Sequence, residues 1–198
     1  MTSTSKAPAS RTDGRLNRST RTRAAIVEAF IELIRAGNMS PTSEEVAERA
    51  QVGLRTVFRH FEDMESLYRE VNRIILSSIE QEFEFAPLQG DLETRLRGLM
   101  ERRGALFTRI QPFVMSTLAR RWRSPFLQRT YKTFAELQHT YLLDSLPEVK
   151  DLDLPLQRAV EQLASFDTWN RMRDTQGLSQ KAAEDVQVEA ILALLATS

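Results

Sequence analysis

The chain has 198 residues, 41% hydrophobic and 27% charged, and its 27 basic and 27 acidic side chains cancel; this composition is that of a globular protein with one or two domains. It has no cysteine, which excludes disulfides and thiol chemistry, and its longest apolar run, residues 190–196, is too short for a membrane-spanning helix. The N-terminus lacks the apolar core of a secretory signal, so we expect a cytoplasmic protein with no membrane partner.

The chain is expected to be all-helical, because it has only 7 glycines and 7 prolines and is rich in alanine, leucine, glutamate and arginine. No strand-like alternation of apolar and polar residues is present. Charge is distributed unevenly: residues 1–60 hold 10 basic and 6 acidic side chains, whereas residues 61–198 hold 17 and 21. This asymmetry favours contact between the N-terminal end and a polyanion.

Residues 1–18 are rich in Ser, Thr, Ala, Pro and Arg and contain little that can be buried, so we expect them to form a flexible basic arm. The first helix is predicted to begin near Ser19 or Thr20, since either side chain can cap a helix. Apolar residues then recur at helical spacing over 26–34, and Gly37 is a suitable C-terminal stop.

Two short helices are predicted to follow. The second helix of the chain begins after Thr42, which forms a capping box with Glu45 three residues later. The third spans about Leu54–His60 and follows a tight turn that contains Gly53. Its apolar side is predicted to point inward through Val52, Val57 and Phe61. Three short helices, the last two joined by a tight turn, are the plan of a helix-turn-helix domain, which we place at residues 19–62.

The outward side of the third helix has a composition that suits DNA recognition. It contains arginine, threonine and histidine and no acid: Leu54, Arg55, Thr56, Phe58, Arg59 and His60. Arg55 and Arg59 lie one turn apart and can reach guanine edges or phosphates when such a helix lies in a major groove. The helix N-termini at Thr42 and Asp63 offer backbone amides to phosphates. The pattern alone leaves open a generic helical bundle with a solvated basic face.

Residues 63–198 are predicted to form a larger helical domain. Asp63 can cap a long fourth helix that continues to about Phe83. Proline, glycine and polar stretches divide the rest into further helices, and Pro112 is expected to separate two of them. The expected helices lie near 92–109, 111–121, 125–146, 155–175 and 179–196.

Residues 40–67, SPTSEEVAERAQVGLRTVFRHFEDMESL, resemble the DNA-binding domain of TetR-type transcriptional regulators. That domain has a threonine before its second helix, Ala-Gly-Val-Ser in the turn, Thr-x-Tyr-x-His-Phe in the third helix and a lysine at the start of the fourth. The match extends over about 20–70, and residues 165–196 resemble the closing two helices of many members. The resemblance implies a homodimer, an all-α ligand-binding domain and, most often, a repressor released from a near-palindromic operator by a small molecule.

The resemblance also assigns roles by position. It implies that four residues touch or frame the DNA backbone, namely Thr42, Thr56, Phe58 and His60. Arg55 and Arg59 are then the expected base readers. With the neighbouring polar and basic residues, the predicted DNA-binding set is Arg21, Arg23, Thr42, Ser43, Leu54, Arg55, Thr56, Phe58, Arg59 and His60.

The chain departs from the family pattern at four positions. Gln51 stands where the family has glycine, which costs up to ~1 kcal/mol if a left-handed geometry is kept. Gly53 replaces serine and remains a usable N-cap. Phe58 and Met64 replace the tyrosine and the lysine that contact phosphate, so a hydroxyl group and a charge are absent. We expect the arginine-rich segment 15–23 to compensate by following the DNA backbone or entering the minor groove.

Aromatic residues gather in the predicted C-terminal domain and are expected mostly to form its core. A cavity among these helices would bind an apolar or aromatic compound, with His139 or Asp167 as polar handles. The candidate ligand-binding residues are Phe107, Phe113, Trp122, Phe134, His139, Phe166 and Trp169. The last two predicted helices, about 155–196, are the expected dimer surface, because their apolar face needs cover; packing within one chain is the alternative.

Eight basic residues and no acid lie between Arg102 and Lys132. We expect them to pair with the acidic surplus of residues 136–198 or with glutamates at positions 80, 82 and 84. A pocket or surface for an anionic ligand is the alternative interpretation.

Two other classes of function remain to be weighed against DNA binding. For an enzyme, the chain offers only two histidines, no cysteine, no glycine-rich phosphate loop and no Gly-x-Ser-x-Gly motif, so we expect no catalytic residue, metal or cofactor. The principal alternative is a helical scaffold or adaptor that does not bind DNA. The basic arm and the acid-free third helix argue against it.

Overall fold

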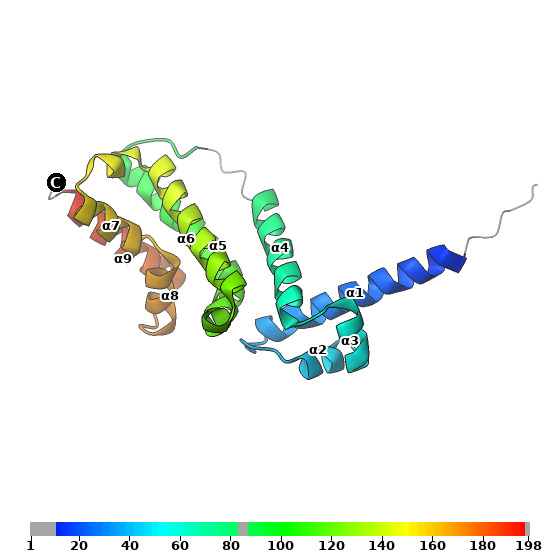
Figure 1. The fold of residues 1–198 in the computed structure, drawn as a ribbon. Helices are drawn as coiled ribbons and strands as arrows, with labels where there is room; N and C mark the ends of the chain where they lie inside the picture. The colour runs from blue at the N-terminus through cyan, green and yellow to red at the C-terminus, as the bar shows by residue number, and fades with distance from the viewer. Residues whose placement is uncertain (1–10, 83–86, 197–198) are drawn as a thin grey trace, which may run out of the picture. The chain divides into compact units, whose positions relative to one another are not determined.

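The computed structural model describes residues 11–82 and 87–196, and every regular element in these ranges is a helix (Figure 1). The predicted all-α class is thereby confirmed. Contacts divide the chain into two compact units, Met1–Ser78 and Ile79–Ser198. The division falls inside helix α4, Met64–Glu82, whereas the sequence suggested a boundary just before that helix.

The N-terminal unit contains helices α1, Arg11–Arg35, α2, Ser43–Arg49, and α3, Leu54–His60, together with most of α4. Buried apolar side chains from all parts of the unit form its core, including Ile26, Phe30, Ile34, Val46, Val57, Phe61, Leu67 and Val71. The predicted inward direction is confirmed for Val57 and Phe61, whereas Val52 is only half-buried. This core supports the two short helices, which are too short to be stable alone.

Helix α1 begins at Arg11, so residues 11–18 are helical rather than a flexible arm; residues 1–10 lie outside the described residues. Thr20, a predicted cap, lies inside the helix, and its hydroxyl donates a hydrogen bond to the Leu16 carbonyl at 3.0 Å. Extension of an existing helix is far easier than nucleation, so the packed half of α1 continues into a polar half. That half is exposed from Leu16 onward and projects beyond the other helices of its unit (Figure 1).

The C-terminal unit is built around helix α5, Leu92–Arg120, against which α6, α8 and α9 pack. Its other elements are the 3-10 helix η1, Arg121–Arg123, then α6, Pro125–Ser145, the 3-10 helix η2, Pro147–Asp151, α7, Leu154–Leu163, α8, Phe166–Asp174, and α9, Gln180–Leu195. Its main core consists of Leu96, Leu99, Met100, Leu142, Leu146, Val149, Val160, Ala164, Val188 and Ile191. These residues come from nearly every element of the unit, so the predicted larger helical region is confirmed.

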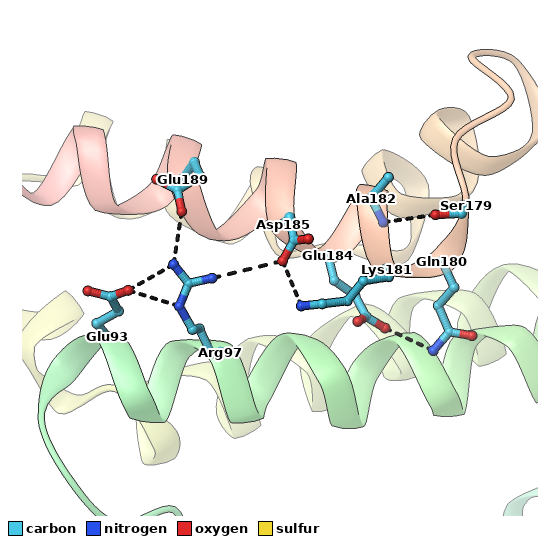
Figure 2. A network of polar contacts seen from close by, with 9 residues as sticks. All are labelled: Glu93, Arg97, Ser179, Gln180, Lys181, Ala182, Glu184, Asp185 and Glu189. Carbon is cyan, nitrogen blue, oxygen red and sulfur yellow. Dashed lines mark hydrogen bonds and ion pairs between the residues drawn. The ribbon is translucent and has the colours of Figure 1, made fainter.

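Polar contacts join α5 and α9 along one edge of their interface (Figure 2). Arg97 on α5 lies 2.8 Å from Glu93 on its own helix and 2.9 Å from Glu189 on α9. Inside the interface the buried carboxylate of Glu184 accepts a hydrogen bond from the Gln180 side chain at 2.8 Å. Exposed ion pairs contribute only about 0–1 kcal/mol each, so the buried face of α9 supplies most of the stability of this contact.

Helix α5 runs without a break through Pro112, where the sequence had predicted a boundary between two helices. Proline inside a helix removes a backbone hydrogen bond and costs about 3 kcal/mol. Burial of a single large apolar side chain stabilises by about 1.5–3 kcal/mol. Helix α5 buries such residues on both sides of the proline, namely Leu96, Leu99, Met100, Phe107, Ile110 and Val114. Burial therefore outweighs the local penalty.

The single helix predicted for 155–175 is instead two helices, α7 and α8, separated by a turn at Ser165. The Ser165 hydroxyl accepts a hydrogen bond from the backbone amide of Thr168 at 3.3 Å and caps α8. The turn lets Val160 pack in the main core while Trp169 joins an aromatic cluster. The helices predicted near 125–146 and 179–196 are confirmed to within about one residue at each end.

Candidate nucleic-acid interface

Two findings concern the described residues as a whole. None of the helices described is both long enough and apolar enough to cross a membrane. In the same part of the chain, no group of three or more histidine, aspartate or glutamate side chains is arranged to hold a metal ion.

Helix α2 begins with the predicted capping box. The Thr42 hydroxyl accepts from the Glu45 amide at 3.2 Å, and the Glu45 carboxylate accepts from the Thr42 amide at 2.8 Å. The hydrogen bond from the Thr42 backbone, and then those from the side chains of Asn38 and Thr42, lower the pKa of Glu45, which therefore stays ionised. The Ser43 hydroxyl donates to the Glu44 carboxylate at 3.1 Å. The box fixes the N-terminal end of α2 with both hydroxyl groups at the surface of the unit.

The turn between α2 and α3 keeps the left-handed geometry at Gln51, which has φ of 55°. Hydrogen bonds from the Gln51 amide to Glu48 and from the Val52 amide to Ala47 close α2 in a Schellman motif. The position calls for glycine, and glutamine adopts it at a cost in conformational energy. Gly53 then precedes α3 in an extended conformation and supplies no side-chain cap.

Helix α3 presents four exposed side chains on one side, Leu54, Arg55, Phe58 and Arg59, and buries Val57 on the other. Leu54 and Phe58 are 37% and 47% exposed, which is high for large apolar residues. Within the described part of the chain, the side chains of Arg55 and Arg59 form no hydrogen bond or ion pair, whereas Arg49 is paired with Glu32 at 2.6 Å. Thr56 is half-buried. The face therefore offers two unpaired cations flanked by apolar surface.

His60, which the sequence placed on or beside this face, lies at its side rather than on it. It is half-buried, and its Nε2 atom is shielded from solvent and has no hydrogen-bond partner among the described residues. Burial, and then the positive charges of Arg59 and Arg23, lower the pKa of His60. The imidazole is thus kept neutral beside two arginines, and it frames the end of α3 rather than projecting from it.

The two predicted arginines of α1 differ in their surroundings. Arg21 is exposed. Arg23 is turned into the unit: its guanidinium donates to the His60 carbonyl at 2.9 Å, lies 4.2 Å from the centre of the Phe61 ring and 3.5 Å from Glu70. No pattern in the sequence indicates this difference, because both arginines precede the apolar run of α1. Arg21 forms none of these contacts, whereas the Arg23 side chain makes all three and is still 40% exposed.

Helix α4 begins with the predicted cap at Asp63, whose carboxylate accepts from the Ser66 amide at 2.7 Å. The side chain of Met64, which occupies the position of the family's lysine, is half-buried. An acidic cap already occupies this helix N-terminus, so a phosphate placed there would meet a negative charge. The first turn of α2 also contains two carboxylates, Glu44 and Glu45, so both helix N-termini considered are acidic.

Four of the seven candidate ligand-binding residues pack together in one cluster: Phe107, Phe134, Phe166 and Trp169. Their ring centres lie 5.4 to 6.5 Å apart in five pairs. Such rings form a packed core between α5, α6 and α8, as expected for most of the aromatic residues. The other two aromatic candidates lie elsewhere: Phe113 is half-buried, and Trp122 is 66% exposed in η1.

A cleft of about 320 Å³ lies beside this cluster and is lined by α5, α6, α7 and the start of α8. It contains both predicted polar handles, His139 and Asp167. It also contains Arg103, from the basic segment whose alternative interpretation was an anion pocket, and two charged residues that the sequence did not single out, Arg158 and Glu161. No sequence spacing could have indicated this set, because its members come from separate helices. Eight of its ten lining residues are polar or charged, which favours the alternative of an anionic ligand over an apolar or aromatic one.

Arg103 forms the buried floor of the cleft and is 4% exposed. Its guanidinium donates to the backbone carbonyls of Ala164, at 2.6 Å, and Gln138. Burial lowers its pKa to about 10, so it remains charged at neutral pH. At the rim, the Nδ1 atom of His139 lies 3.3 Å from the Glu161 carboxylate.

The basic residues of segment 102–132 contact aromatic rings as well as the acidic residues expected from the sequence. Lys132 lies 3.7 Å from Glu136, as an acidic surplus in the later part of the chain would suggest. Arg121 and Arg123 instead lie over aromatic rings, at 4.4 and 4.0 Å from the ring centres. Aromatic faces attract cations through the ring quadrupole, so arginine is accommodated there without an acid.

Comparison with known proteins agrees with the geometry of the N-terminal unit. Residues 26–71 match the family model described as "Bacterial regulatory proteins, tetR family". The matched span runs from the buried start of the α1 core through α2, the turn and α3 into α4. The resemblance to TetR-type regulators is thereby confirmed for this part of the chain. A search of curated proteins found no match.

Proposed function

We propose that the protein is a homodimeric, sequence-specific regulator of transcription that reads its operator with α3. The observation that carries this proposal is the face of α3, where Arg55 and Arg59 are exposed and form no hydrogen bond or ion pair within the described residues. Arginine binds guanine O6 and N7 in a bidentate manner, and such a contact contributes about 1–3 kcal/mol of discrimination.

The other exposed groups divide into two roles. Leu54 and Phe58 supply apolar surface next to the arginines, which suits contact with sugars or thymine methyl groups. Thr42 and Ser43 at the start of α2, and Arg21 in α1, suit contact with phosphates. Thr56 and the neutral His60 are half-buried beside this surface.

The test is enrichment of duplexes from a random-sequence library, followed by a mobility-shift titration on the enriched duplex. Arg55→Ala and Arg59→Ala should each weaken binding by about 1–3 kcal/mol and relax base preference at one position of each half-site. Arg49→Ala is the matched control, because that arginine lies in the same unit and is paired with Glu32. Failure of the wild type to enrich any duplex would instead favour the helical scaffold or adaptor.

The dimer is proposed to form through α8 and α9. Helix α9 turns Ala183, Val188 and Ile191 into its own chain but leaves Val186 44% exposed. Two copies paired about a two-fold axis would form a four-helix bundle and would require a near-palindromic operator. Half-sites would then be about 34 Å apart, one turn of DNA, or a multiple of that distance.

A small molecule is proposed to release the protein from DNA by binding the cleft beside Arg103. The cleft has the volume of a small-ligand site, and its charged lining favours a polar compound with an acidic group near the buried guanidinium. Such a compound would act by binding one of two conformations better than the other.

A thermal-shift screen of small organic acids tests this assignment of the effector. A compound that raises the melting temperature should also weaken operator binding. Arg158→Ala, at the rim, should reduce the thermal shift, whereas Arg129→Ala, outside the cleft, should leave it unchanged. A compound that stabilises both variants equally would place the effector elsewhere.

A further inference from the structure

Helix α3 has few attachments to its own unit. It spans only Leu54–His60, and within the helix only Val57 is fully buried. It cannot extend further, because Phe61 follows in an extended conformation with φ of −135° and ψ of 120°, and its last carbonyl groups must therefore be satisfied by other groups. The direction in which Arg55 and Arg59 project thus depends on what holds the C-terminal end of α3.

Arg23 of α1 holds that end. Its guanidinium donates a hydrogen bond to the His60 carbonyl at 2.9 Å, and a cation is favoured at a helix C-terminus, where it meets the negative end of the helix dipole. The same guanidinium lies 4.2 Å from the centre of the Phe61 ring, which is 3% exposed. The Arg23 side chain thus contacts both His60, the last residue of α3, and Phe61, the residue that follows the helix.

Arg23 also connects this point to α4. Its second terminal nitrogen lies 3.5 Å from the Glu70 carboxylate, which accepts a further hydrogen bond from Arg73 at 3.0 Å. These arginines lower the pKa of Glu70, so it remains ionised. Arg23 is therefore anchored at three points, on α3, on the Phe61 ring and on α4, and its charge is offset within the unit.

We propose that Arg23 is a positioning residue: it sets the orientation of α3 for base recognition without itself contacting DNA. This inference rests on the proposed DNA binding. The proposal assigns different roles in DNA binding to Arg21 and Arg23, which are neighbours on α1. Arg21 is exposed and would contact a phosphate, whereas Arg23 acts through α3.

Salt dependence distinguishes the two roles, because removal of one phosphate contact reduces the slope of log affinity against log salt by about 0.9. Arg23→Gln should weaken binding to the enriched duplex by about 10-fold or more, the effect expected when one base contact is removed. Its binding to a scrambled duplex should weaken far less than its binding to the enriched duplex, as loss of one distant charge would cause, and its salt slope should stay unchanged. Arg21→Gln is the control and should weaken both duplexes alike with a lower slope. Equal weakening on both duplexes for Arg23→Gln, with a reduced slope, would show a phosphate contact and overturn the proposal.

Two further variants separate position from charge. Arg23→Lys keeps the charge but cannot reach all three partners, so it should also bind the enriched duplex more weakly; full activity of this variant would show that charge alone matters. Glu70→Gln removes an acid and, by charge alone, should tighten binding to any DNA. If Glu70 holds Arg23 in place, the ratio of specific to non-specific affinity should instead fall by about two- to fivefold.

A measurement without DNA keeps the proposal testable even if no operator is found. Amide hydrogen exchange in Arg23→Gln should become faster in α3 than in wild type, while exchange in the α1 core and in α2 changes little. Uniform acceleration across the unit would indicate a general loss of stability and would refute a specific hold on α3. Unchanged exchange in α3 would refute it too.

Discussion

At the residue scale, the partners of each arginine decide its role. Arg55 and Arg59 are exposed and form no ion pair in the described part of the chain, Arg23 is anchored at three points, and Arg103 is buried on two backbone carbonyls. Each has another basic residue within four positions of it in the sequence, so the sequence does not distinguish them. The distinction depends on which groups the fold brings within hydrogen-bond reach, and it changes which arginine is expected to touch DNA.

Gln51 offers a direct test of local strain. Replacement by glycine should stabilise the N-terminal unit by about 0.5–1 kcal/mol. The left-handed conformation costs residues other than glycine about 1–2 kcal/mol, and relief of this strain is partly offset because glycine makes the unfolded chain more flexible. Chemical denaturation of the full chain measures the change. Gln51→Ala keeps the strain and should give no gain; a similar gain from alanine would show that the glutamine side chain, not the backbone, is at fault.

His60 should make stability depend on pH. Burial and the nearby arginines lower its pKa below the ordinary value of 6.5, so the unfolded chain binds a proton more readily than the folded one. The stability contributed by neutral His60 is therefore fully present above the ordinary pKa of histidine. It is lost progressively as the pH falls from that value to the lower pKa of His60 in the folded protein. Thermal unfolding between about pH 5 and 8 should show this loss. The His60→Gln variant should show a flatter profile; an identical profile would contradict the prediction.

At the scale of the elements, caps and burial together set where helices begin and end. Thr42 caps α2 where the sequence predicted it, and Ser179 caps α9 at the predicted start of the last helix. Pro112 and Ser165 were misjudged for opposite reasons: α5 gains enough burial to continue through a proline, whereas a serine inside an apparently continuous pattern begins a new helix. Local signals identify possible boundaries, and packing selects among them.

The contact between α5 and α9 depends on a glycine. A methyl group at Gly104 would lie 2.0 Å from the buried Glu184 carboxylate, so Gly104→Ala must displace that side chain and break its hydrogen bond with Gln180. We expect a net loss of about 1–3 kcal/mol from this overpacking. In a Glu184→Ala background the same change should instead stabilise by up to about 1 kcal/mol through helix propensity. Thermal unfolding of the four proteins measures the coupling, and additive effects would contradict it.

At the scale of the whole molecule, the chain forms two compact units with separate cores, joined along α4. The N-terminal unit presents the face proposed to bind DNA. The C-terminal unit has the polar cleft and the surface proposed for dimer formation. Regulation would require these functions to be coupled, and α4 is the only helix in the described part of the chain that belongs to both units.

The dimer proposal predicts a change of mass. Val186→Glu should convert the dimer to a monomer in sedimentation experiments, because it introduces a charge into the proposed helix pairing. It should also weaken operator binding, since each half-site would then be bound independently. Leu137→Glu is the matched control, an equally polar change at a 55% exposed leucine on α6. A dimer that survives Val186→Glu but not Leu137→Glu would move the interface to α6.

The helical class, the helix-turn-helix plan and the face with Arg55 and Arg59 could all be predicted from the sequence, because they depend on periodicity, capping residues and short spacing. Three other features emerged only from the folded chain: Arg23 is committed to α3, His60 is half-buried, and Arg103 lies beneath a cleft. Distance along the chain explains the difference. Arg23 meets a carbonyl 37 positions away and Arg103 one 61 positions away, and no local pattern in the sequence encodes such contacts.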